Sequence, residues 1–205
     1  MKQTLTAFTA FTAVAIVAAP AFAAPVVGKP APNFKLADSN GKVVTLSDFR
    51  GKTVVLEWHN PGCPFVRKHY GSGNMQRTQA AAAKAGVVWL TINSGAPGKQ
   101  GHMNGADAKT FLGTSGASPT AYLIDYRGIV GKVYDAKTTP HMYVVNKAGT
   151  LVYAGGIDDK PTANPADVAG ARNHVLAALS EIGAGKAVSV ATTRPYGCSV
   201  KYADS

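Results

Sequence analysis

Apolar residues along the chain form short continuous runs separated by polar or glycine-containing stretches, a pattern typical of buried strands joined by helices and turns. The runs at 53–58 and 87–92 are apolar enough to predict two buried strands, and a shorter strand is expected at 122–124. Apolar pairs on either side of glycine-containing turns predict two hairpins, one over 34–46 and one over 142–153.

Helices are predicted between these strands. The first begins at Pro64, is interrupted at 71–73 by Gly-Ser-Gly, and resumes over 75–84. Asn164-Pro165 is a typical helix start, so one continuous helix is expected from there to about residue 182. Two short helices are expected at 106–112 and 128–134. The order predicts an α/β fold, with a central mixed β-sheet flanked by helices on both faces.

The N-terminal residues have the pattern of a secretory signal peptide. Lys2 precedes a stretch of apolar and small residues, and Ala21-Phe22-Ala23 is an A-x-A cleavage signal. The apolar run is too short to span a bilayer. The prediction is therefore a signal peptide over 1–23 and a single domain over 24–205, periplasmic or otherwise exported, with no stable membrane insertion.

The formal net charge of +10 raises the question of nucleic-acid binding. The lysines and arginines of the chain are scattered along the sequence rather than clustered in a basic patch. The export signal also argues against a nucleic-acid partner. The charge is interpreted as a contribution to solubility.

Cys63 is the candidate reactive group. It follows the strand at 53–58 and directly precedes Pro64, which fits the first turn of a helix. Free N–H groups and the helix dipole stabilise an anion at that position, and Arg67 and Lys68 add positive charge one turn further on. These features predict a thiol with a lowered pKa; the alternatives are an inert buried cysteine or half of a structural disulfide.

Four segments resemble the thioredoxin-like redoxin family, of the alkyl hydroperoxide reductase/thiol-specific antioxidant type: 60–66 (NPGCPFV), 139–140 (TP), 149–159 (GTLVYAGGIDD) and 197–202 (GCSVKY). The resemblance covers nearly all of the expected mature chain and implies a thioredoxin fold. It also implies that Thr139 and Pro140, on a loop that can hold a cis-proline, pack near Cys63 and offer backbone groups to a substrate. The expected substrate-binding residues are Thr139 and Pro64, and the expected catalytic residues are Cys63, Cys198, Asn60, Arg67 and Pro140.

The active-site motif departs from the family in one position. Many relatives carry C-x-x-C-P-[YF]-V, and Asn60 stands where their first cysteine would be. Peroxiredoxins of the same superfamily have T-x-x-C-P with a single peroxidatic cysteine, which Cys63-Pro64 partly matches. Leu56 stands where they have a proline, and Arg67 or Arg127 are the candidates for their arginine.

Cys198 is the second of the two cysteines and lies in a C-terminal tail rich in glycine and proline. In the leading interpretation it is the resolving thiol: a sulfenic acid on Cys63 condenses with it, and an exported thiol reductant restores both. The substrate is a peroxide or a protein disulfide, and no cofactor or metal is expected. A permanent structural disulfide is the alternative for this compartment.

Other functions stay open at this point. The protein is alternatively a monothiol disulfide exchanger, or a non-catalytic fold that docks partners beside Pro140. A copper carrier is a further alternative, because His59 and His141 are both expected near Cys63, with Met103 and Met142 as possible soft ligands. Glu57 is expected either to face solvent or to act as a proton acceptor near Cys63. The loop at 94–101 lacks a nucleotide-binding pattern.

Overall fold

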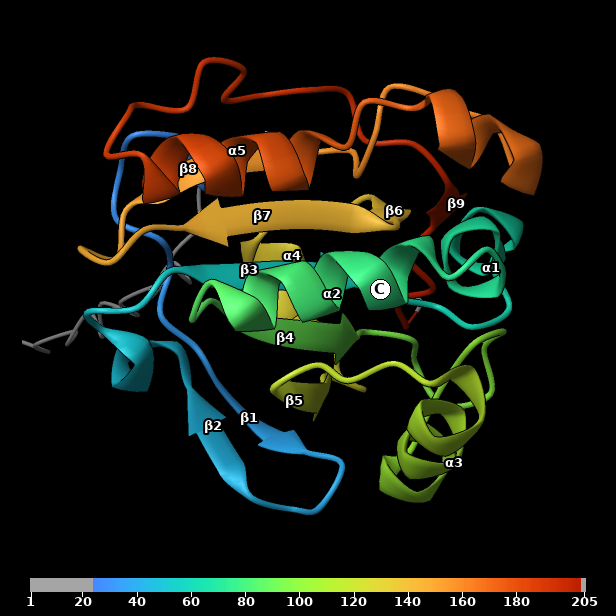
Figure 1. The fold of residues 1–205 in the computed structure, drawn as a ribbon. Helices are drawn as coiled ribbons and strands as arrows, with labels where there is room; N and C mark the ends of the chain where they lie inside the picture. Colours follow the sequence, from blue (N-terminus) through green and yellow to red (C-terminus); the bar gives the residue numbers. More distant parts are fainter. Residues whose placement is uncertain (1–23, 204–205) are drawn as a thin grey trace, which may run out of the picture.

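A seven-stranded mixed β-sheet forms the centre of the protein in a computed structural model that describes residues 24–203 (Figure 1). Its strand order is β2-β1-β5-β4-β3-β7-β8. Strands β3, β4 and β5 are parallel to one another, and the other neighbours are antiparallel. The strands are β1 (Lys35–Asp38), β2 (Val43–Thr45), β3 (Val54–Trp58), β4 (Val88–Asn93), β5 (Ala121–Ile124), β7 (His141–Val145) and β8 (Leu151–Gly155).

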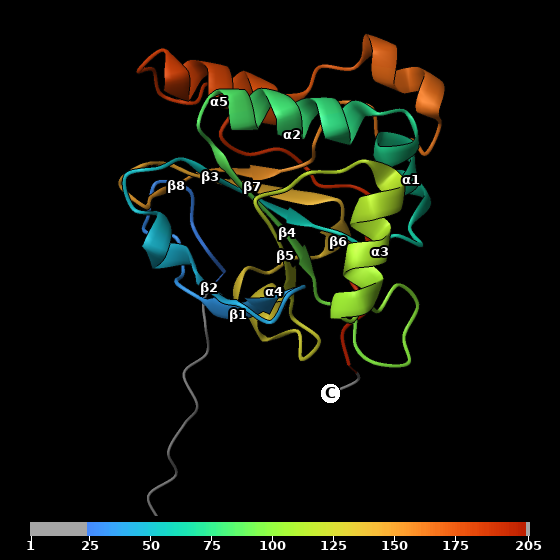
Figure 2. The same cartoon turned by 60° about the horizontal axis from the view of Figure 1, so that its bottom comes forward.

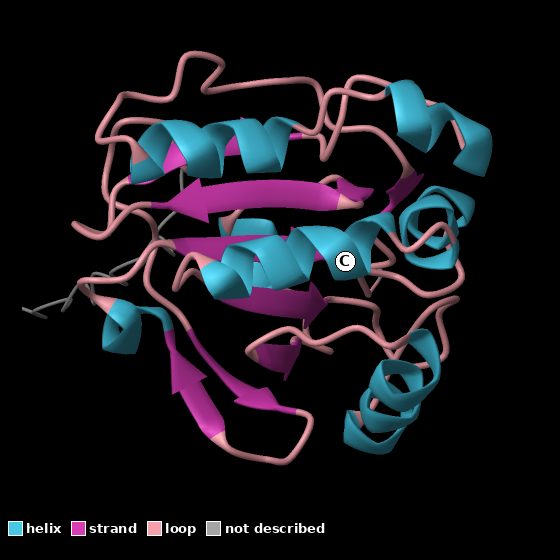
Figure 3. Ribbon diagram, viewed as in Figure 1, coloured by secondary structure: helices cyan, strands magenta, loops and turns pink. Residues whose placement is uncertain are grey.

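Helices cover both faces of this sheet, and a two-stranded sheet lies at one end of it (Figures 2 and 3). Helices α2 and α5 lie over one face and α4 over the other, while α1 and α3 lie towards one end. The α-helices are α1 (Pro64–Gly71), α2 (Asn74–Lys84), α3 (Gly105–Ser115), α4 (Ile129–Val133) and α5 (His174–Gly183); the 3-10 helices are η1 (Leu46–Phe49) and η2 (Pro165–Gly170); the small sheet pairs β6 (Thr138–Thr139) with β9 (Cys198–Ser199).

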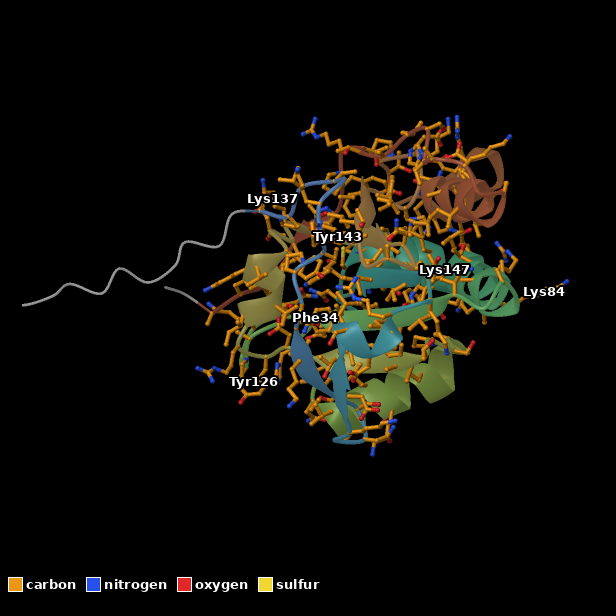
Figure 4. The ribbon with its side chains drawn as sticks, turned by 90° about the vertical axis from the view of Figure 1, so that its left-hand side faces the viewer. Phe34, Lys84, Tyr126, Lys137, Tyr143 and Lys147 are labelled. Atoms are coloured by element: carbon orange, nitrogen blue, oxygen red, sulfur yellow. The ribbon has the colours of Figure 1, made fainter. Side chains whose placement is uncertain are left out.

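Alternation along β3 divides the core into two layers. Val55 packs in the cluster beneath α2 and α5, whereas Leu56 and Trp58 pack with α4 on the opposite face. Phe34 and Tyr143 are buried in the second layer, and the charged Lys84, Lys137 and Lys147 are exposed (Figure 4). A sheet buried on both faces explains why its central strands are nearly continuous apolar runs.

The predicted fold class is confirmed: a mixed sheet with helices on both faces, in a thioredoxin-like arrangement. The single helix expected from Asn164 to residue 182 is wrong. Asn164 caps only η2, and the Asn173 side chain accepts a hydrogen bond from Leu176 N at 2.9 Å to begin α5 separately. An N-cap residue has extended backbone, so the helical conformation cannot continue through Asn173. The stretch therefore contains two helices in place of one.

The proposed signal peptide over 1–23 lies outside the described residues. Within the described part of the chain, no helix is both long and apolar enough to cross a membrane.

The expectation that Glu57 faces solvent is wrong: its carboxylate is fully buried near the end of β3, enclosed by hydrogen-bond donors. It accepts hydrogen bonds from Tyr70 Oη (2.7 Å), Trp89 Nε1 (2.8 Å), Thr91 Oγ1 (3.0 Å) and Gln79 Nε2 (3.5 Å). Burial raises the pKa of Glu57, and these hydrogen bonds oppose that rise. Its partners lie on α1, α2 and β4, so Glu57 joins helices to the sheet rather than serving Cys63.

Glu57→Ala is therefore expected to destabilise the fold. The substitution leaves the Tyr70, Trp89 and Thr91 donors buried without an acceptor, and we expect a loss of about 3 kcal/mol in the free energy of unfolding. Urea unfolding followed by circular dichroism measures it. Asp48→Ala, at an exposed carboxylate, is the control; an equal effect of the two substitutions would contradict this account.

Candidate active site

Cys63 is placed by the turn that joins β3 to α1. It is the N-cap residue of α1, in extended conformation, and Pro64 occupies the first helical turn as predicted. The Cys63 N–H donates to the Asn60 carbonyl at 3.1 Å, which closes the turn. The Cys63 side chain is 0% exposed, so any reagent must reach it through the groups that cover it.

Cys198 reaches Cys63 through strand pairing of the C-terminal tail. In the small antiparallel sheet Cys198 is the register partner of Thr139, and the Cys63 Sγ lies 3.1 Å from the Thr139 carbonyl oxygen. The Thr139–Pro140 peptide bond is cis. Cys63 and Cys198 are far apart in the sequence, both have free thiols, and they meet at the cis-proline loop. Figure 1 shows β9, which contains Cys198, between β6 and α1.

The two thiols have opposite pKa shifts. Burial on its own raises the pKa of Cys63, but hydrogen bonds from the Cys198 thiol and from the Val66 and Cys198 backbone N–H groups, together with Thr139, bring this pKa below its usual value. Burial, and then the hydrogen bond and negative charge of Cys63, raise the pKa of Cys198 to about 11. The pair therefore favours a Cys63 thiolate that accepts a hydrogen bond from the Cys198 thiol.

Asn60 forms hydrogen bonds that link the loop at 94–101 to the turn that contains Cys63. Its Oδ1 accepts from Gly62 N at 2.8 Å, and its Nδ2 donates to Gln100 Oε1 at 3.0 Å. The loop lies so close that a Cβ on Gly101 would be 1.9 Å from Asn60 Oδ1. Where many relatives have a cysteine, this chain therefore has an amide that bonds to the glycine-rich loop at 94–101, a link that no local sequence motif indicates.

The two basic residues expected to act on Cys63 are placed differently from the prediction. Arg67 is exposed, and its charge lowers the pKa of Cys198 as a minor influence behind burial and Cys63. Lys68 is 1% exposed, and its Nζ lies 3.5 Å from Asp158 Oδ2. Hydrogen bonds, rather than the two cationic side chains, therefore account for the lowered pKa of Cys63. Arg127 is exposed in the turn between β5 and α4.

The histidines considered for copper lie in separate surroundings. His59 packs against aromatic rings and contacts Tyr122 Oη through Nδ1 at 2.7 Å, and burial lowers its pKa to about 3. His141 stacks on Tyr143. Within residues 24–203, no three side chains among histidine, cysteine, aspartate and glutamate gather as a metal ion would require.

The pH profile of Cys63 alkylation tests whether the Cys198 thiol donates a hydrogen bond to the Cys63 thiolate. Since only the thiolate reacts, we expect the half-maximal rate in reduced protein at a pH below the usual 9.0 of this thiol. In Cys198→Ala the hydrogen bond from the Cys198 thiol is lost, burial dominates, and the midpoint moves to higher pH. Iodoacetamide labelling resolved by peptide mass measures both. Ser199→Ala, an exposed neighbour, is the control, and an unchanged midpoint in Cys198→Ala would contradict the assignment.

A mixed sheet, a buried cysteine at the start of the first α-helix and a cis-proline facing it together define a redoxin of the thioredoxin fold. Residues 27–154 match the AhpC/TSA family, and the chain belongs to that family. This confirms the resemblance found in the sequence.

Curated relatives include a thiol-disulfide oxidoreductase and a peroxiredoxin. The chain is 28% identical over 132 residues to thiol-disulfide oxidoreductase ResA of Bacillus subtilis, covering 61% of this chain and 64% of that protein. It is 30% identical over 137 residues to chloroplastic peroxiredoxin Q of Triticum aestivum, covering 57% of this chain and 62% of that protein. The matches thus span less than two thirds of each relative.

Among solved structures, the chain resembles an uncharacterized conserved protein from Geobacillus kaustophilus. The TM-score is 0.77 and the identity 28%, and the match covers 88% of this chain and 94% of that one. The similarity therefore includes nearly the whole described domain, beyond the segment matched by the family.

Proposed function

We propose that this protein is a thiol-dependent oxidoreductase with peroxidase-type activity, in which Cys63 reacts with the oxidant and Cys198 resolves the product. The observation that carries the proposal is the pairing of two free thiols of unequal pKa across the cis-proline loop. A single cysteine at a helix start is a weak indication of redox chemistry, but a second cysteine delivered to it by strand pairing is a specific arrangement.

In the first step the Cys63 thiolate attacks one oxygen of a peroxide. The S–O bond forms as the O–O bond breaks, a proton goes to the departing oxygen, and the products are a sulfenic acid and an alcohol or water. Cys63 is oxidised by two electrons and the peroxide is reduced by two. The helix N-terminus stabilises the starting thiolate, and we assign Pro64 the role of presenting Cys63 at that terminus.

In the second step the Cys198 sulfur attacks the Cys63 sulfur. An S–S bond forms, the S–O bond breaks, and the hydroxyl group leaves as water with the Cys198 proton. Conversion of the Cys63 thiolate to a sulfenic acid removes the negative charge and the hydrogen bond of that thiolate, both of which raise the pKa of Cys198. The nearby Arg67 charge favours the thiolate form of Cys198. The first reaction therefore prepares the second thiol.

A thiol reductant must then restore both cysteines. Cys198 is partly exposed whereas Cys63 is fully buried, so the incoming thiolate attacks Cys198 and expels the Cys63 thiolate. A second thiol of the reductant releases Cys198 as its own disulfide forms. A pocket of about 610 Å³ lies along the segment of the tail that precedes Cys198, with Thr138, Tyr196 and Gly197 among its lining residues. For an exported chain, this reductant is an exported dithiol.

Residues around the thiols have supporting roles in this proposal. Thr139 supplies the strand that receives Cys198, and its carbonyl oxygen accepts a hydrogen bond from Cys63 when that thiol is protonated. Pro140 shapes that loop through the cis peptide bond, and Asn60 closes the turn before Cys63.

Thiol–disulfide exchange with a protein is the second candidate. The similarity to ResA favours it, and the paired edge of Thr138–Thr139 is a backbone surface on which an extended peptide would dock. The tail already occupies this edge, so a protein substrate must first displace β9. A small peroxide faces no such competition, which is why we place the peroxidase reaction first.

Reaction of the reduced protein with one equivalent of hydrogen peroxide tests the proposal. We expect both thiols to disappear within seconds as one intramolecular disulfide forms, at a rate well above that of free cysteine. Quenching by alkylation and measuring intact mass gives the thiol count. A rate no faster than that of free cysteine would reject the peroxidase reaction, and rapid reduction of a protein disulfide instead would establish the exchange function.

A further inference from the structure

The C-terminal tail contacts α1 at two places. Cys198 packs in the same apolar cluster as Cys63, and the ring of Tyr196 lies 5.9 Å from that of Phe65. Both contacts are made by the short segment 196–198, which leads into β9, so Tyr196 and Cys198 bind the tail to α1 on either side of Gly197. Gly197 lies between them with φ +134, so near β6 that a Cβ there would be 2.0 Å from Thr139 O.

A buried polar cluster that the thiol chemistry does not use lies under the Tyr196 hydroxyl. Lys68, His69 and Asp158 are 1%, 0% and 4% exposed. Lys68 Nζ donates to the Lys160 carbonyl at 2.7 Å and forms the ion pair with Asp158 described above. An unpaired charge is costly at this depth, so each of these groups requires the others.

The hydrogen bonds of the cluster form a chain from Asn74 through His69 and Tyr196 to Asp158. Asn74 Nδ2 lies 2.8 Å from His69 Nδ1, so Nδ1 accepts and the ring proton is on Nε2. Burial, followed by Asp158 and Lys68 acting in opposite senses, lowers the pKa of His69 to about 4, which keeps the ring neutral. His69 Nε2 then donates to Tyr196 Oη at 3.1 Å, and the Tyr196 hydroxyl donates to Asp158.

We propose that Tyr196, seated by Lys68, His69 and Asp158, is a positioning residue that holds the Cys198 thiol beside Cys63. The proposal rests on the resolving role given to Cys198 above. Tyr196 takes no part in the condensation itself, in which the Cys63 sulfenic acid and the Cys198 thiol give a disulfide and water. It acts by fixing where the tail approaches α1, and a small displacement of Cys198 slows closure strongly.

Tyr196→Phe tests the proposal because it keeps the ring against Phe65 and removes only the hydroxyl. Sulfenic acid formation depends on peroxide concentration, whereas closure of the disulfide does not, so stopped-flow measurements separate the two rates. We expect closure to be about tenfold slower, the effect of losing one hydrogen bond to a charged group, with sulfenic acid formation changed by less than about twofold.

Tyr153→Phe is the matched control. Tyr153 is a buried tyrosine whose hydroxyl contacts Thr193 Oγ1 on the same tail, upstream of Cys198. We expect this variant to close the disulfide at the normal rate. Normal closure in Tyr196→Phe, or equal slowing in both variants, would overturn the proposal, since the second result would reflect general loosening of the tail.

Hydrogen exchange separates this proposal from the function on which it rests. The Cys198 amide donates to the Cys63 sulfur and the Val200 amide to the Lys137 carbonyl, so docking of the tail protects both. In reduced Tyr196→Phe these two amides are expected to exchange at least about tenfold faster than in the unaltered protein, because the tail detaches more often. This result requires no peroxide chemistry. Unchanged exchange would overturn the positioning role, whereas absence of sulfenic acid in the unaltered protein would reject the peroxidase proposal alone.

Discussion

Replacing Cys63 with serine is expected to abolish reaction with hydrogen peroxide, lowering the rate constant by at least about a thousandfold. Serine keeps the size and hydrogen bonding of the side chain but supplies no thiolate. The remaining thiol is a poor substitute, because burial is the largest of the influences that raise the pKa of Cys198 to about 11. Competition kinetics against a reference peroxide-consuming thiol measures the loss.

The converse substitution, Cys198→Ser, separates the two roles. We expect the first step to proceed and the sulfenic acid on Cys63 to persist, so that one thiol is lost instead of two. A dimedone adduct located by peptide mass identifies it. If Cys198→Ser lost the peroxide reaction while Cys63→Ser kept it, the assigned roles would be reversed.

Gly197→Ala is expected to release the tail from the active site and slow disulfide closure by about a hundredfold or more. The added Cβ would lie 2.0 Å from the Thr139 carbonyl oxygen, and the φ of +134 is one that only glycine adopts readily. The obstructing atom belongs to the backbone of β6, so a side-chain rotation cannot relieve the contact. Closure is measured by following the remaining thiols after a single addition of peroxide.

Gly183→Ala is the matched control, because a Cβ at the end of α5 meets nothing within 4 Å. This variant is expected to close the disulfide at the normal rate, and both variants are expected to retain the circular dichroism spectrum of the folded domain. Normal closure in Gly197→Ala would mean that Cys198 reaches Cys63 without the β6–β9 pairing.

Much of the fold could be predicted from local patterns in the sequence. Continuous apolar runs identified β3 and β4, and the glycine-containing turns identified both hairpins, since strand burial and turn geometry are imposed residue by residue. Cys63 was found in the same way, from a cysteine and proline at a strand–helix junction. The interruption between η2 and α5 was missed because Asn164-Pro165 was taken as the start of one helix and the second cap at Asn173 was not recognised.

The contacts that complete the site could not be found by such means. The bond from Asn60 to Gln100 and the ion pair of Lys68 with Asp158 join segments far apart in the sequence, and no spacing rule relates them.

Because β9 pairs with β6, the proposed redox couple of Cys63 and Cys198 would join the C-terminal tail to the first α-helix, instead of joining two turns of one helix. Only the docked tail presents Cys198 to Cys63, so the reduction potential of the couple contains the free energy of docking. By linkage, oxidation strengthens docking as much as docking favours oxidation. A more oxidising environment therefore increases the free energy needed to detach the C-terminal tail. The increase would be measured as slower proteolysis of the tail or as a higher force needed to pull it away.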